Sequence, residues 1–201
     1  MPDQRTVSPL GTSSGLGALF LGRAIAGLLL GAAVTFSATD HSAAYGSVVF
    51  GAWAVLQAIV VVVSAVRGGR GPGQRILLVQ GVLGGVIGAV ALALTGFGLG
   101  ALLLVVTAFA AVTGALELYR AVRIERGSAA GRESLFVGIL TAVLAIVFLA
   151  IPPDEVLAVG LIGGYGIVVG VYLAIAGISL RMPTARPEGA REGAADRGVE
   201  S

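Results

Sequence analysis

The chain has 201 residues, of which 56% are hydrophobic and only 12% carry a charge. Because a soluble domain carries about 25% charged residues, we expect residues 16–180 to lie inside a membrane as one domain. The chain has no cysteine and only one histidine. This composition excludes disulfides, thiolate nucleophiles, iron–sulfur clusters and histidine-based metal clusters. The sequence therefore predicts a membrane protein without a metal site or a cofactor.

Residues 1–15 and 181–201 differ in composition from the rest of the chain. Both segments are rich in small residues, proline and mixed charge, so they can bury too little apolar area to offset the entropy of ordering. We therefore expect both terminal segments to be disordered.

Six long apolar segments lie between the two termini. A helix needs about 17–25 apolar residues to cross a bilayer, and each segment meets that length. We therefore expect an all-α fold, an integral membrane bundle of six transmembrane helices. The segments cover residues 16–36, 43–66, 76–94, 97–119, 135–151 and 156–180.

The first apolar segment has a second interpretation, which is a cleaved signal peptide. A polar start precedes it and small residues follow it. However, its length of about 21 residues exceeds that of a signal-peptide apolar region, and Arg23 interrupts it. We therefore expect this segment to remain as the first span.

Very short turns join some of the expected helices. Thr95-Gly96 ends one helix through the freedom of glycine, and Pro152-Pro153 ends another because proline blocks helix continuation. Tight turns make the neighbouring helices antiparallel. We therefore expect three rigid helical hairpins, with longer and looser loops between them, over residues 16–67, 76–123 and 135–181.

The three expected hairpins share a repeated pattern of residue types. Each first helix carries a ladder of small residues, and each second helix has an aromatic residue followed by a small one and then a closing arginine. The aromatic residues recur at a spacing of 56, and the starts of the ladders recur at a spacing of 57. The ladders are Arg23-Ala24, Gly27 and Gly31; Gln80-Gly81, Gly84 and Gly88; and Val137-Gly138, Thr141 and Ala145. The second-helix residues are Trp53, Ala58 and Arg67; Phe109, Gly114 and Arg123; and Tyr165, Gly170 and Arg181.

This pattern resembles the HdeD-like bacterial membrane proteins, which are short six-span proteins made of three such hairpins. The resemblance covers roughly residues 16–181. It implies a multipass protein of the bacterial plasma membrane. Because the family's named member is linked to acid resistance, it also implies a role in acid or envelope stress. The family supplies no agreed catalytic residues, so none are assigned here.

Four polar side chains are predicted to lie inside the membrane, where each needs a protein partner, water or a route to the interface. Arg23, Gln80 and Glu117 are expected at similar depth in the inner leaflet, and Gln57 deeper. One interpretation is a polar cluster in which Arg23 pairs with Glu117. Alternatively, Arg23 extends to the headgroups and Glu117 is an interfacial residue near Arg120. Gln57 is expected to form a hydrogen bond between helices.

Glycines four residues apart lie on one face of a helix, where two backbones can approach closely. The sequence predicts this use for Gly27, Gly31, Gly84, Gly88, Gly166 and Gly170. A glycine-rich nucleotide loop would need a preceding strand, and the sequence provides no such context.

The arginines indicate the orientation of the chain in the membrane. All 13 basic residues are arginine, and the segments 67–75, 120–134 and 181–201 contain most of them, whereas 37–42, 95–96 and 152–155 contain none. Short loops rich in Lys or Arg stay in the cytoplasm, so we expect both termini to be cytoplasmic. The expected partner is the lipid bilayer, including anionic lipid near residues 67–75, and not nucleic acid.

The sequence leaves three functional hypotheses. The first is a non-enzymatic multipass protein of the HdeD-like type. The second is a small transporter or channel that uses the polar cluster, and a homo-oligomer is compatible with both. The third, an intramembrane enzyme, lacks a nucleophile–base pair, paired carboxylates and metal ligands among the apolar segments, so we expect no enzymatic activity. The sequence identifies no small-molecule substrate.

The arginine distribution generates a prediction about topology. Reporter fusions after Met182 and within residues 67–75 should report the cytoplasm, and a fusion at Asp154 should report the opposite side. An external C-terminus would contradict six spans with both termini inside.

Overall fold

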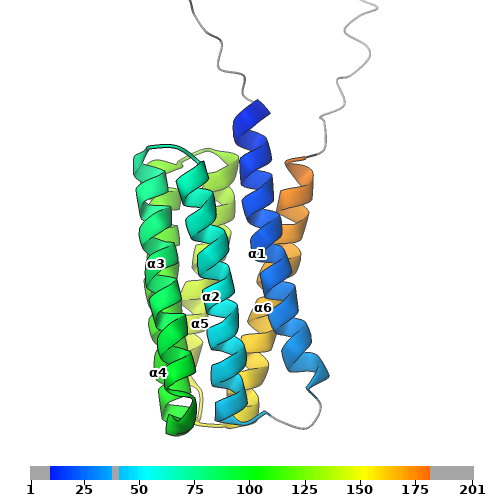
Figure 1. The fold of residues 1–201 in the computed structure, drawn as a ribbon, viewed down its shortest axis with the longest axis vertical. Helices are drawn as coiled ribbons and strands as arrows, with labels where there is room; N and C mark the ends of the chain where they lie inside the picture. Colours follow the sequence, from blue (N-terminus) through cyan, green and yellow to red (C-terminus); the bar gives the residue numbers. More distant parts are fainter. Residues whose placement is uncertain (1–9, 38–40, 182–201) are drawn as a thin grey trace, which may run out of the picture.

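The computed structural model of the chain describes residues 10–37 and 41–181, which form six long helices (Figure 1). A 3₁₀ turn, η1 (Thr95–Phe97), precedes α4, and a π-helical turn, η2 (Arg120–Ile124), follows it. The long helices are α1 (Leu10–Phe36), α2 (Ala43–Arg67), α3 (Pro72–Ala93), α4 (Gly98–Tyr119), α5 (Ala129–Ala150) and α6 (Glu155–Ser179).

All six helices are long and apolar enough to cross a membrane, which confirms the predicted all-α, multipass architecture. The candidate spans begin and end within five residues of the predicted segments. Helix α1 begins at Leu10, so residues 10–15 are helical rather than disordered. This extension follows because a residue added to an existing helix gains a hydrogen bond without a new nucleation step. Residues 1–9 and 182–201 lie outside the described residues.

The connections at the arginine-rich end, where α1 begins and α6 ends, are shorter than expected. Only residues 68–71 join α2 to α3, and only residues 125–128 join η2, which continues α4, to α5. Gly69 and Gly127 have φ values of 89° and 77°, a left-handed conformation that favours glycine. Pro72 begins α3, and the Ser128 hydroxyl accepts a hydrogen bond from the backbone N–H of Gly131 at the start of α5. These loops are therefore shorter than the predicted loop segments 67–75 and 120–134.

The helices pair differently from the predicted hairpins. The most extensive contacts join α1 with α6, α2 with α3, and α4 with α5, and Figure 1 shows α1 and α6 side by side. The predicted pairs, α1 with α2, α3 with α4 and α5 with α6, have fewer contacts. Helices α2 to α5 therefore pack most closely against the helix to which they are joined at the arginine-rich end of the bundle. The first and last helices, α1 and α6, pack against each other.

Glycine explains this choice of partners, because it lets two helix backbones approach closely. A Cβ atom added at Gly27 would lie 2.8 Å from the carbonyl oxygen of Gly166, and the reverse distance is also 2.8 Å. A Cβ at Gly88 would lie 2.9 Å from the Cβ of Ala54, and one at Gly114 would lie 3.1 Å from the backbone nitrogen of Ala142. Each closely packed pair therefore has a seam, a line of contact where small residues bring the two backbones together.

Most of the glycines predicted to pack do so at these seams. Gly31 faces Ile167 and the carbonyl oxygen of Gly163, and a Cβ at Gly170 would lie 2.9 Å from the backbone nitrogen of Leu28. Gly84 differs, because it faces the centre of the bundle, where a Cβ would lie 3.3 Å from the ring of Phe109.

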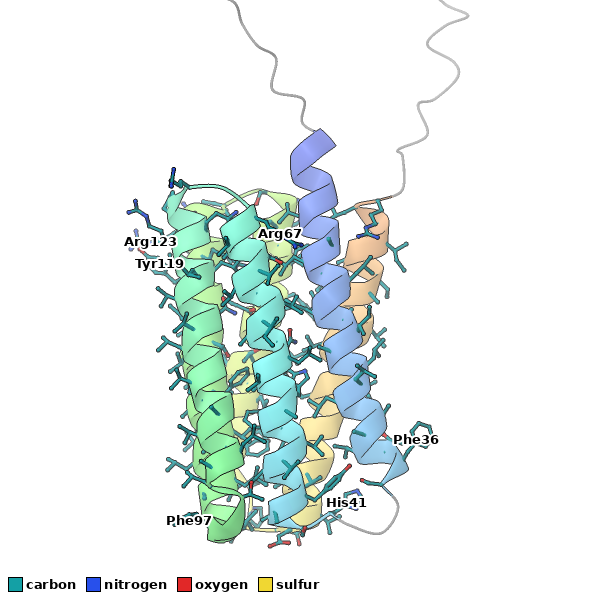
Figure 2. All side chains as sticks on the ribbon, in the orientation of Figure 1. Phe36, His41, Arg67, Phe97, Tyr119 and Arg123 are labelled. Atoms are coloured by element: carbon teal, nitrogen blue, oxygen red, sulfur yellow. The ribbon has the colours of Figure 1, made fainter. Side chains whose placement is uncertain are left out.

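The opposite end of the bundle carries Phe36, His41 and Phe97 (Figure 2). Acidic side chains cap helices there. The backbone N–H of Ala43, which begins α2, donates to the Glu155 carboxylate at 3.0 Å, and the N–H of Leu157 donates to the Asp154 carboxylate at 2.7 Å. Acids at helix N-termini satisfy N–H groups that lack partners within the helix. Asp154 and Glu155 therefore have structural roles.

The seams generate a prediction about stability. Gly88→Leu should lower the free energy of unfolding in detergent by about 1–3 kcal/mol, because overpacking forces the α2 and α3 backbones apart. Thermal unfolding measures the effect. Gly164→Leu is the matched control, since Gly164 is exposed on α6 with open space where its Cβ would be. Equal melting temperatures for the two variants would contradict the seam.

Candidate functional site

An ion pair between Arg23 and Glu117 lies at the centre of the polar residues. The guanidinium of Arg23, on α1, donates to Oε1 of Glu117, on α4, at 2.5 Å. The side-chain amide of Gln80, on α3, donates to the same oxygen at 2.9 Å. These three side chains come from three different closely packed helix pairs, so the cluster joins the pairs to one another.

Burial distinguishes between the two interpretations of the charged residues. Only 7% of Arg23 and 1% of Glu117 is exposed. An arginine that extended to the headgroups would keep its guanidinium at the surface. The structure therefore agrees with the interpretation in which Arg23 pairs with Glu117, and not with an extended Arg23 or an interfacial Glu117. The reason is that each charge can be neutralised locally, whereas an isolated one would cost several kcal/mol.

Aromatic rings close the bundle beside the polar cluster. Trp53, Phe109 and Tyr165 come from α2, α4 and α6, and the Trp53 ring meets the other two edge-on at centroid distances of 5.3 and 6.0 Å. The Tyr165 hydroxyl lies 2.7 Å from that of Thr141 on α5. Residues that recur every 56 positions in the sequence therefore meet at one place in the structure.

A small cavity of about 30 Å³ lies between the ion pair and these rings. That volume has room for about one or two water molecules. All six helices contribute to its walls. The lining residues are Arg23, Trp53, Ala54, Gln57, Ala58, Val61, Gln80, Gly81, Gly84, Phe109, Thr113, Glu117, Thr141 and Tyr165.

Several polar atoms at this cavity have no hydrogen-bond partner among the described residues. They include Oε2 of Glu117, Oε1 of Gln57 and Oε1 of Gln80, which are acceptors, and Nε of Arg23 and Nε1 of Trp53, which are donors. Gln57 was expected to bond to another helix, but its Oε1 has no such partner. Because buried polar atoms without partners are costly, the cavity suits water or a small polar group.

A second polar contact was missed by the sequence reasoning. Arg120, placed in a loop by that reasoning, is only 3% exposed and continues α4 as the first residue of η2. Its guanidinium donates to Ser134 on α5 at 2.5 Å and to the Glu125 carboxylate at 3.3 Å. The spacing of these residues gave no signal, because their meeting depends on the π-helical turn.

The site has limited chemical capacity. Its two formal charges have opposite sign and are neutral together. Across residues 10–37 and 41–181, no group of three or more His, Cys, Asp or Glu side chains could hold a metal ion. The arrangement can bind water or another small polar molecule.

Comparisons with family models, with curated proteins and with solved structures gave no match for this chain. The resemblance to the HdeD-like proteins therefore rests on the sequence pattern alone.

The ion pair generates a prediction that a double-mutant cycle can test. Arg23→Ala or Glu117→Ala alone should lower the free energy of unfolding by about 3–5 kcal/mol, because each leaves the other charge buried and unpaired. The double variant should lose much less stability than the sum of the losses of the two single variants, because residues in contact give non-additive effects.

Gln57→Leu is the control for general disturbance of the cavity. Gln57 lines the same space, but its Oε1 bonds to no described residue, so this variant should change stability little. Additive losses for Arg23→Ala and Glu117→Ala, within a few tenths of a kcal/mol, would contradict the pair.

Proposed function

We propose that this chain is a non-enzymatic multipass protein of the bacterial plasma membrane, of the HdeD-like type, and that it acts in the response to acid or envelope stress. The observation that carries the proposal is the buried cluster of Arg23, Glu117 and Gln80 at the centre of a glycine-packed bundle. Ionisable residues inside membrane spans are costly and are usually retained for function.

We also propose that the six helices descend from three copies of one helical hairpin. Two observations support this repeat. Trp53, Phe109 and Tyr165, which are equivalent by position, gather at the centre. Arg23 and Gln80, which begin equivalent ladders, bond to the same carboxylate oxygen.

The orientation with both termini in the cytoplasm is part of the same proposal. The described end of α6 lies at the same end of the bundle as the start of α1 (Figure 1). Arg67 and Arg123 also lie there (Figure 2). An arginine-rich end is retained on the cytoplasmic side.

A small transporter or channel is the second candidate, and the central cavity favours it. The cavity is lined by polar groups without partners, which a transported molecule could satisfy. Its volume of about 30 Å³ is too small for a solute larger than one or two water molecules. If this second function is correct, proteoliposomes that contain the wild-type protein should show a higher ion or solute flux than empty vesicles.

The proposed function can be tested by complementing a deletion strain under acid and envelope stress. The wild-type gene should restore survival. The double variant Arg23→Leu/Glu117→Leu should not, although it should fold, because replacing a buried ion pair with apolar side chains is often neutral or stabilising. Immunoblots of membrane fractions check that the variant accumulates normally.

Gly164→Leu is the matched control in this strain, because the exposed Gly164 lies away from the cluster and has open space around it. It should complement fully. Full rescue by the double leucine variant would contradict a functional cluster, and a deletion strain without a phenotype in any of these stresses would contradict the stress role.

A further inference from the structure

A second hollow lies on the flank of the bundle at the arginine-rich end. It is an open groove of about 520 Å³ between the start of α3 and the end of α4. Figure 2 shows Tyr119 and Arg123 together on this flank. The lining residues are Arg70, Gly71, Pro72, Arg75, Ile76, Tyr119, Arg123 and Ile124.

The groove concentrates positive charge. Arg70, Arg75 and Arg123 are exposed, and none of them forms an ion pair with another described residue. No carboxylate is among the described residues that line it. Glu125, which follows the groove residue Ile124, is already held by Arg120 and Ser134 at 3.3 Å. Three guanidinium groups therefore share one hollow without a counter-charge from its walls.

We propose that this groove binds the headgroup phosphate of an anionic phospholipid. Guanidinium groups bond phosphate oxygens through two parallel N–H donors, and this geometry makes arginine a preferred residue for phosphate recognition. Basic pockets between membrane helices are suited to anionic headgroups. The volume of about 520 Å³ lies in the range of small-molecule sites and accommodates a phosphoglycerol group.

The surface next to the groove indicates that the phosphate belongs to a lipid. Arg75, Val79, Val82 and Val86 follow one another at spacings of four, three and four residues, so they form one stripe along α3. The three valines are 48%, 52% and 56% exposed. An acyl chain can therefore run along this stripe while its headgroup occupies the groove.

Tyr119 supports the same placement. It lies at the end of α4 and is 53% exposed. Tyrosine is enriched at the level of the headgroups, where its ring is partly apolar and its hydroxyl can reach water. The groove therefore lies where the polar and apolar parts of a phospholipid meet.

Native mass spectrometry of the full chain in detergent can test this inference. The titrants are phosphatidylglycerol and, for comparison, zwitterionic phosphatidylcholine. The wild type should bind the first phosphatidylglycerol molecule more tightly than the first phosphatidylcholine molecule. The variant Arg70→Gln/Arg75→Gln/Arg123→Gln should bind it roughly 100-fold more weakly, because each basic residue near an anionic lipid contributes about fivefold. The single variant Arg75→Gln, at an exposed position, should lose about fivefold.

The matched control is Arg67→Gln/Arg126→Gln/Arg132→Gln. It removes the same charge from exposed positions that do not line the groove, and it should keep affinity within about threefold. Equal losses in the two triple variants, or an unchanged affinity in Arg75→Gln, would overturn the site.

Competition by inorganic phosphate distinguishes the source of the phosphate. Millimolar phosphate should leave the first bound phosphatidylglycerol in place. Its complete displacement would overturn the assignment to a lipid.

Discussion

The close approach of helix backbones at glycine is the constraint on which the rest of this structure depends. Lipid tails are as apolar as leucine, so helices in a bilayer gain little by hiding apolar side chains from one another and rely on tight packing instead. At the seam between α1 and α6, Gly27 and Gly166 each leave room for the other's carbonyl oxygen, 2.8 Å from where a Cβ would lie. Shape at such positions determines which helices become partners.

Polar and aromatic side chains then hold the three closely packed pairs together. Glu117 accepts hydrogen bonds from Arg23 and Gln80, and Trp53 contacts rings from two other helices. The polar set and the aromatic set each contain one side chain from each of the three helix pairs. In a medium of low dielectric constant an ion pair is strong but tolerates little rearrangement, so the cluster fixes the pairs in one arrangement around the small cavity.

The sequence predicted the spans, because apolar length is a strong and local signal. It offered the contact of Arg23 with Glu117 only as one of two interpretations, because a long arginine side chain near a span end can also reach the headgroups. It did not predict which helices pair most closely. A glycine ladder shows that one face of a helix can pack closely against another helix. It does not show which helix that is, because this depends on the complementary face of a helix that can be distant in the sequence. Arg120 was assigned to a loop because arginines near span ends usually follow the topology rule; only the π-helical turn places it against Ser134. The cavity could not be predicted from any single segment, because residues from all six helices form its walls.

The pairing of α1 with α6 has a consequence for the biogenesis of the protein. The ribosome makes about 5–20 residues per second, so the 94 positions between Arg23 and Glu117 separate their synthesis by about 5–20 s. Throughout that interval the first span carries an arginine whose final counter-charge does not yet exist, and its long stem lets the charge reach the headgroups meanwhile. The glycine face of α1 lacks its packing partner for even longer, because α6 is the last helix to be synthesised. The helix that is synthesised first therefore completes its packing only when the final span has entered the bilayer.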